Sequence, residues 1–422
     1  MKSLVGLFAL LVMPWSLLAQ SGGFNYDETK VPRFELPDPL KMADGTPVKT
    51  ARVWETRRRP EVLALFEREV YGRSPGRPNA MTFQVVEHRK GVLDGRADRH
   101  QVEVRFNGKA DGPRMTILIY RPAKAPRPVP AFLTLNFRGN HTIHDDPAIH
   151  LTHAWVRGRV RGETENNRAT EKGRGVAKSR WAVDKILTAG YALATIYYGE
   201  IDPDFHDDWK NGVHSLYPKP KPDEWGSVAT WAWGLSRALD YLETDAGINH
   251  KQVAVMGHSR LGKTSLWAGA ADPRFALVIS NNSGCGGAAL SRRAFGETVQ
   301  RINTSFPHWF NDNFLKYNGN ENACPVDQHL LIALAAPRPV YIASAVEDRW
   351  ADPRGEFLSG RYANPVYKLY GLSGMPADRQ PPVDQPVMGT IGYHVRSGKH
   401  DVTSFDWEQY LKFADKHLKQ GK

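Results

Sequence analysis

The chain has 422 residues, 41% of them hydrophobic and 24% charged, so its composition excludes a disordered chain and allows a sizeable core. The formal net charge is +11, but the basic residues are scattered rather than gathered in an arm or patch. Together with the leader described next, this argues against a nucleic-acid partner. The charge favours anionic partners or serves solubility alone.

The first 19 residues have the form of a secretory signal peptide. Lys2 supplies a positive start, residues 4–18 are nearly all apolar, and Ala19 is a small residue at a suitable cleavage point. The alternative is a membrane anchor, but the run is short for a stable span. No later stretch is apolar enough to cross a bilayer. We therefore expect a secreted or periplasmic protein without stable membrane association.

Residues 50–71 show apolar side chains at helical spacing, with Pro60 as a helix-start signal. Strands separated by turn residues follow. They are expected at 81–87, 100–106, 115–120 and 130–137. The last of these ends in a glycine-bearing loop, Arg138-Gly139, where hydrolases of the α/β type place an oxyanion donor.

Residues 142–180 are polar and without clear periodicity, so we expect a long excursion over the sheet. The stretch from His141 to His153 contains several histidines and aspartates. Their order matches no zinc motif, and we expect no metal site.

The rest of the chain alternates strands and helices. We expect a helix at 182–189, a strand at 192–197, an amphipathic helix at 225–242, strands at 277–280, 339–344 and 391–395, and a last helix at 407–417. Such alternation predicts an α/β fold, a three-layer αβα sandwich with a mostly parallel central sheet. There is no internal repeat and no dividing linker, so residues 20–422 are predicted to form a single domain.

The stretch 251–271 carries the strongest functional signal. An apolar strand at 253–256 leads through a sharp turn at Ser259 into a helix, which is the form of a nucleophile elbow. The usual G-x-S-x-G pattern is altered, because Leu261 holds the second glycine position and Gly262 follows it. The alternative is an ordinary strand-to-helix turn with a capping serine.

Two later loops supply an acid and a base in the chain order of α/β-hydrolases, Ser, acid, His. His400 is the predicted base, and His394 is its rival within a strand. Asp348 is the predicted acid, with Glu347 next to it and Asp352 as a third choice. The carboxylate would hold the imidazole tautomer and stabilise its positive charge.

Two cations follow the serine. The backbone N–H of Arg260 is placed for an oxyanion, and its guanidinium adds positive charge near the same oxygen. Lys263 lies one helical turn on, within reach of a polyhydroxylated or anionic substrate. Cations at a helix start oppose the helix dipole, which favours a functional role for both residues.

The chain has two cysteines, Cys285 and Cys324. In an exported protein an isolated pair favours a disulfide, which is the expectation here. Two buried free thiols are the alternative.

The motif GHSRLGK (257–263) resembles the glucuronoyl esterases, carbohydrate esterase family 15, in their bacterial form. The segments NFRGNHT (136–142), YGEID (198–202), GCGG (284–287) and EDRW (347–350) resemble that family in the same order. The resemblance spans most of the chain after about residue 50, and it implies an α/β-hydrolase fold.

The resemblance implies hydrolysis of esters between 4-O-methyl-glucuronic acid on xylan and lignin alcohols, without a cofactor. It gives Ser259 as nucleophile, His400 as base and Arg260 as oxyanion stabiliser. It also matches the cysteine pair to a disulfide position. Three further residues match positions that recognise the glucuronate hydroxyls: Lys263, Glu297 and Trp350.

One departure bears on the acid. Fungal members place it in the loop before the Gly-Gly pair, where this chain has Asn282, so the acid should be Asp348, as in bacterial relatives. An acetyl-xylan or other carbohydrate esterase with the same triad is the alternative function, and a non-catalytic carbohydrate-binding protein is more remote. We expect a monomer whose partner is glucuronoxylan joined to lignin.

Overall fold

The structure is a computed structural model that describes residues 23–126, 128–158 and 162–419. The predicted signal peptide, residues 1–19, lies outside the described residues. Within them, no helix is both long and apolar enough to cross a membrane.

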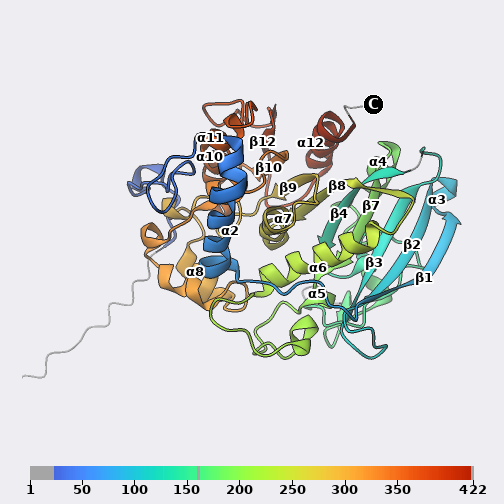
Figure 1. The fold of residues 1–422 in the computed structure, drawn as a ribbon. Helices are drawn as coiled ribbons and strands as arrows, with labels where there is room; N and C mark the ends of the chain where they lie inside the picture. The colour runs from blue at the N-terminus through green and yellow to red at the C-terminus, as the bar shows by residue number, and fades with distance from the viewer. Residues whose placement is uncertain (1–22, 127, 159–161, 420–422) are drawn as a thin grey trace, which may run out of the picture.

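A ten-stranded twisted sheet runs through the molecule (Figure 1) in the order β1-β2-β3-β7-β4-β8-β9-β10-β12-β11. The strands are β1 (Thr82–Gly91), β2 (Ala97–Arg105), β3 (Arg114–Pro122), β4 (Val129–Asn136), β7 (Ala192–Tyr197), β8 (Ile248–His258), β9 (Leu277–Asn281), β10 (Val340–Ala345), β11 (Val387–Met388) and β12 (Ile391–Arg396). The six strands from β7 to β12 in this order are parallel, and β1, β2, β3 and β11 pair antiparallel. The predicted mostly parallel sheet is confirmed.

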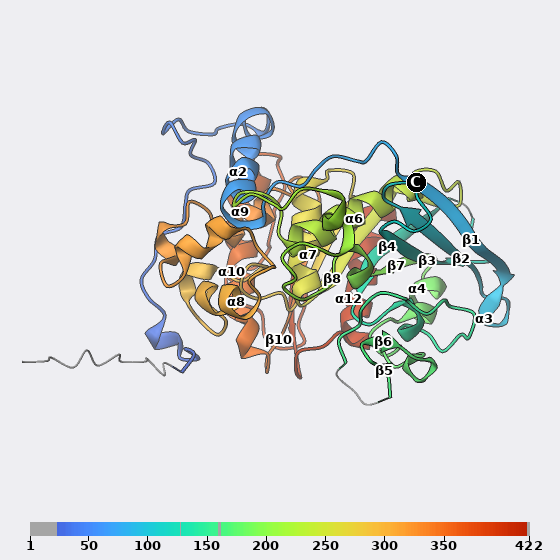
Figure 2. The ribbon, with the colours of Figure 1, turned by 90° about the horizontal axis from the view of Figure 1, so that it is seen from below.

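Helices cover both faces of the sheet, as Figures 1 and 2 show. One face carries α6 (Ser227–Leu242), α7 (Arg260–Ala271), α9 (Gln328–Ala333) and α10 (Pro353–Tyr362), and the other carries α4 (Val183–Thr188) and α12 (Ser404–Ala414). Along β8, Val255 packs into one hydrophobic cluster while its neighbours Ala254 and Met256 pack into the other. This alternation follows from the period of two along a strand and gives the three-layer sandwich.

Shorter helices complete the chain: α3 (Val92–Gly95), α5 (Tyr198–Ile201), α8 (Val299–Ser305) and α11 (Asn364–Lys368). Residues 51–71 form one helical run through α1 (Ala51–Val53) and α2 (Arg59–Phe66). It begins at Ala51, where the Thr50 side chain caps it, so Pro60 lies inside the run and does not start it.

The helix predicted at 225–242 is α6. The prediction of an amphipathic helix implied one solvent-exposed face, but α6 is buried on all sides. All of its residues except Ser236 are buried. α7 packs against it on the same face of the sheet, and the carbonyls of residues 308–309 accept from the amides of Ser227 and Val228 at its start. A pair of charges on α6, Arg237 and Asp240, is buried with its own hydrogen bond of 2.7 Å.

The predicted excursion at 142–180 is irregular. In the part that the structure describes it holds only a two-stranded ribbon, β5 (Thr164–Glu165) with β6 (Arg168–Ala169), and short 3₁₀ turns. Figure 2 shows β5 and β6 apart from the large sheet, at the lower edge of the view.

The predicted disulfide between Cys285 and Cys324 is not formed, because both cysteines are free and buried. Each sits in the larger hydrophobic cluster, where a thiol packs as a small apolar group. Burial raises the pKa of both thiols, that of Cys324 to about 12. The thiolate is the form that exchanges with disulfides, so burial also makes both groups inert.

The two thiols should therefore not react with a thiol reagent in the native protein, and both should react after unfolding. Titration with DTNB, without reductant, should give no reaction in buffer and two thiols per chain in guanidinium chloride. Cys324→Ala should reduce the denatured count to one. If the unfolded wild type gave no thiol without reductant, a disulfide would be present.

Candidate active site

The predicted elbow is present. β8 ends at His258 and α7 begins at Arg260, which leaves Ser259 alone at the turn. Ser259 has φ 58° and ψ −129°, a backbone conformation that L-residues rarely adopt. Its amide donates to the carbonyl of Asn281 at 2.8 Å, which ties the turn to the end of β9.

Two glycines of the elbow lie so close to neighbouring atoms that a side chain would collide with them. A Cβ on Gly257 would lie 1.8 Å from the carbonyl oxygen of Leu261, so only glycine fits there. A Cβ on Gly262 would lie 3.0 Å from the side chain of Ser283. Leu261 itself is buried. The shift of the second glycine therefore places a glycine against the loop after β9 while the preceding leucine packs into the core.

His400 and Asp348 come together as predicted. Nδ1 of His400 and Oδ2 of Asp348 are 2.6 Å apart, and the side-chain amide of Asn282 donates to the same oxygen at 2.8 Å. Burial acts to raise the pKa of Asp348, but the hydrogen bond and charge of His400, with the bond from Asn282, hold it below its ordinary value. The carboxyl is thus kept ionised beside the imidazole.

The alternatives to this pair are engaged elsewhere or face solvent. Glu347 is exposed. Asp352 is buried against Arg293 at 2.7 Å and caps α10 through the amide of Gly355. His394 lies within β12, fully buried. Its ring bonds Asp406 at 2.9 Å, as expected of a structural histidine.

Arg260 is fixed by a buried carboxylate that the sequence analysis did not single out. Asp204, a few residues beyond β7, pairs with the Arg260 guanidinium. Asp204 also accepts from His308 at 3.0 Å, Trp309 at 2.8 Å and Tyr198 at 2.9 Å. Burial acts to raise its pKa, but the His308 bond and the Arg260 charge hold it far below the ordinary value.

Three aromatic rings surround the Arg260 guanidinium. The distances from its central carbon to the ring centroids are 4.9 Å for Trp309, 5.6 Å for Phe306 and 5.9 Å for Phe137. The ion pair and the rings restrict the guanidinium to one position. The signal for Asp204 in the sequence was its place after a strand end, two residues beyond the Tyr198–Asp202 motif.

A cavity of about 150 Å³ brings the predicted residues together. It is lined by Phe137, Arg138, Arg157, Arg180, Tyr198, His258, Ser259, Arg260 and His400. Four of these are arginines and none is acidic. Ser259 and His400 thus face one positively lined space, and Phe137-Arg138 brings the predicted oxyanion loop to its edge.

The arginines of the cavity are held from outside it. Arg138 bonds Glu163 at 2.5 Å, and Arg180 bonds Asp401 at 2.5 Å. Arg157 donates to the backbone carbonyl of Asp204 at 2.7 Å. Sequence reasoning did not single out Arg157 or Arg180, because both lie in the excursion, where no motif marks them.

The structure brings Lys263 and Glu297 together but keeps them, with Trp350, off this cavity's lining. Nζ of Lys263 is 3.6 Å from Glu297 and donates to the carbonyls of Ser283 and Cys285 at 2.5 and 2.6 Å. The amide of Glu297 donates to the carbonyl of Trp350 at 3.0 Å. The three residues form one cluster beside the loops that follow β9 and β10.

The histidines and aspartates of the excursion are not gathered. Among the described residues, no group of three or more His, Cys, Asp or Glu side chains is arranged to hold a metal ion.

Known proteins are similar to this chain over almost its whole length. A profile described as "Glucuronyl esterase, fungi" matches residues 182–371. Carbohydrate esterase MZ0003, from an unknown prokaryotic organism, is 55% identical over 96% of this chain and 94% of its own. The chain belongs to the glucuronoyl esterases of carbohydrate esterase family 15.

Solved structures agree. This esterase resembles a promiscuous CE15 esterase from a marine bacterial metagenome with a TM-score of 0.89 and 55% identity, covering 94% of this chain and 100% of that one. It resembles the glucuronoyl esterase of Solibacter usitatus with a TM-score of 0.86 and 49% identity, covering 92% and 99% of the two chains.

A second buried carboxyl supports the acid loop of the esterase. Glu356 on α10 accepts from the amides of Ser283 and Gly284 at 2.7 and 2.9 Å and from the Ser344 hydroxyl at 2.6 Å. Ser283 and Gly284 directly follow Asn282, whose side chain donates to Asp348. Burial raises the pKa of Glu356 to about 8.

This raised pKa predicts a pH dependence of stability. Between pH 4.5 and about 8 the folded esterase holds a proton on Glu356 that the unfolded chain has released. The contribution of Glu356 to the free energy of unfolding therefore falls as pH rises, by up to about 1.4 kcal/mol per pH unit. Glu356→Gln should remove this slope in urea unfolding. Glu35→Gln, at an exposed site, should keep it, and equal slopes in wild type and Glu356→Gln would contradict the assignment.

Proposed function

We propose that the esterase hydrolyses 4-O-methyl-glucuronoyl esters that join glucuronic acid on xylan to lignin alcohols. The observation that carries the proposal is one cavity lined by Ser259, Arg260 and His400, with Asp348 bonded to the far nitrogen of the histidine. Each group needed for acyl transfer faces the same small space.

In the first step His400 takes the proton of the Ser259 hydroxyl, and the oxygen attacks the ester carbonyl. Asp348 holds the imidazole through Nδ1, which leaves the other ring nitrogen to take the serine proton. The Arg260 guanidinium and backbone amides at the start of α7 stabilise the oxyanion. His400 then protonates the alcohol, which leaves.

In the second step water attacks the acyl-enzyme, with His400 again as general base, and glucuronate is released. The product is an anion in a cavity lined by four arginines, whereas the ester itself is neutral. Positive charge at this place stabilises the negatively charged transition states more than the uncharged substrate.

We assign recognition of the glucuronate hydroxyls to Lys263, Glu297 and Trp350. The side chains of Lys263 and Glu297 are only 4% and 8% exposed and hold each other in an ion pair, so their positions are fixed beside the loops that follow β9 and β10. An acetyl group would need none of this set, which favours a uronate acyl group.

An acetyl-xylan or broader carbohydrate esterase is the second candidate. The observation in its favour is that a solved relative of 55% identity is described as a promiscuous CE15 esterase. We further propose a secreted or periplasmic monomer with one catalytic domain over residues 20–422, acting without a cofactor, a nucleic acid or a membrane.

The function is tested with benzyl glucuronate and 4-nitrophenyl acetate, using wild type and Ser259→Ala. We expect serine-dependent cleavage of the glucuronate ester, with Ser259→Ala reduced by about 10⁴-fold or more in kcat. Acetate cleavage without glucuronate cleavage would select the second candidate. Activity that survives in Ser259→Ala would reject the nucleophile.

Arg260→Ala should lower kcat on benzyl glucuronate by about 10²–10³-fold with a smaller change in KM, because the guanidinium acts mainly in the transition state. Circular dichroism melting checks folding, since the change leaves Asp204 without its ion-pair partner. Arg157→Ala, in the same cavity, is the matched control and should lose less. An unchanged kcat would remove Arg260 from the mechanism.

A further inference from the structure

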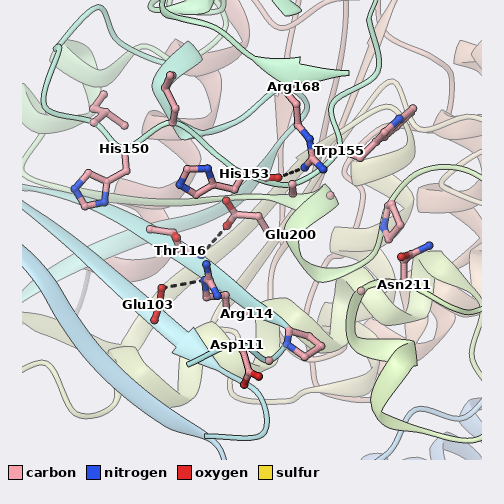
Figure 3. A pocket seen from close by; sticks show the side chains of 18 of the residues that line it. Glu103, Asp111, Arg114, Thr116, His150, His153, Trp155, Arg168, Glu200 and Asn211 are labelled. Atoms are coloured by element: carbon pink, nitrogen blue, oxygen red, sulfur yellow. Dashed lines mark hydrogen bonds and ion pairs between the residues drawn. The ribbon is translucent and has the colours of Figure 1, made fainter. Parts of the chain in front are cut away.

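A second cavity has a volume of about 1340 Å³, and Figure 3 shows the side chains that line it. Tyr198 lines the catalytic cavity, and the next residues, Gly199 and Glu200, line this one. Its walls come from the ends of β2 and β3, from residues 147–155 and 168–174 of the excursion, and from residues 199–215. The volume exceeds that of a site for one small molecule.

The charge of this cavity differs from that of its neighbour. Five acidic residues and four arginines or lysines line it, whereas the catalytic cavity has four arginines and no acid. Several of the charges neutralise one another locally, as Arg114 does with Glu103 at 3.1 Å. A balanced lining selects against a strongly ionic ligand and suits a neutral one.

An aromatic pair stands on the side toward the catalytic cavity. The rings of Trp155 and Phe205 meet edge to face with centroids 4.7 Å apart. The carbonyl of Trp155 accepts from the Tyr197 hydroxyl at 2.7 Å, and Arg157 of the catalytic cavity lies over the indole at 5.9 Å. A fixed, partly exposed indole is a platform for the apolar face of a ring.

Polar groups face the same space. Glu200 lies at the centre of the cavity in Figure 3, between His153 and Asn211, and its carboxylate accepts from the Thr116 amide at 2.7 Å. Burial raises the pKa of Glu200 to about 7, so near neutral pH the carboxyl occurs in both forms and can accept or donate a hydrogen bond. Donors and acceptors interleaved around an aromatic platform match a ligand with many hydroxyls.

We propose that this cavity binds a neutral oligosaccharide, with Trp155 as the stacking platform and Glu200 as a hydrogen-bonding partner. The assignment goes beyond ester hydrolysis, and only the choice of a xylan-derived probe rests on the function proposed above. The glycan has two possible sources, the chain that carries the scissile ester or a separate chain of the same polymer.

The test is calorimetric titration of the full chain with xylohexaose and with cellohexaose. We expect wild type to bind one or both, Trp155→Ala to weaken binding at least about fivefold, and Glu200→Gln to weaken it by a smaller factor. Tyr362→Ala removes a ring that is 44% exposed and lines neither cavity, so it should bind as wild type does. Melting curves establish that each variant is folded.

Kinetics separate the two sources. If the esterified chain occupies the cavity, Trp155→Ala lowers kcat/KM for benzyl esters of long aldouronic oligosaccharides but not for benzyl glucuronate. If a separate chain occupies it, hexaose binding falls while both esters react as with wild type.

The proposal is overturned if wild type binds neither hexaose, or if Trp155→Ala and Glu200→Gln bind as wild type does. Binding of a lignin-type aryl ether that Trp155→Ala abolishes, without hexaose binding, would overturn it in favour of an aromatic ligand. These outcomes are measured by binding and not by ester turnover. Failure of the proposed hydrolysis would therefore be distinguished from failure of the proposed glycan binding.

Discussion

The close approach of the chain to itself at Ser259 is the constraint on which the site depends. The Leu261 carbonyl lies where a Cβ of Gly257 would be, and this lets β8 turn into α7 within one residue. The serine is left at the carboxyl edge of the sheet. Because the strands from β7 to β12 are parallel, their carboxyl ends reach the same edge. The acid and histidine loops meet Ser259 there, and the packing of the two faces keeps that edge in place.

Arginines at the site are paired with carboxylates that lie outside the cavity. Positive groups face the catalytic cavity, and the carboxylates that neutralise them lie behind, as Asp204 does for Arg260 and Glu163 for Arg138. The cations therefore stay ordered in the absence of substrate while their charge remains directed at the reacting atoms. Asp348 is a further buried carboxylate, kept ionised by His400 and Asn282.

Much of the fold and of the candidate site was predictable, because apolar runs mark the strands and the residues that follow each run are known from the sequence. The turn at Ser259, the place of Asp348 after β10 and the place of His400 after β12 could be read from apolar runs and the residues that follow them. Asp204 could not, since its role arises from contact with Arg260, 56 residues away. The cysteine prediction was wrong because export and pairing rules say nothing of the positions of two Cα atoms. The burial of α6 was missed because the segments that cover it come from later in the chain.

The ion pair between Arg180 and Asp401 has a consequence for how such enzymes can be altered. It joins the last turn of the irregular excursion to the residue that follows His400, across 221 positions of sequence. An excursion transplanted from a relative would arrive without its partner unless position 401 came with it. The excursion and the loop that carries His400 are thus joined by one ion pair, so a change at either end of the pair should be felt at the other.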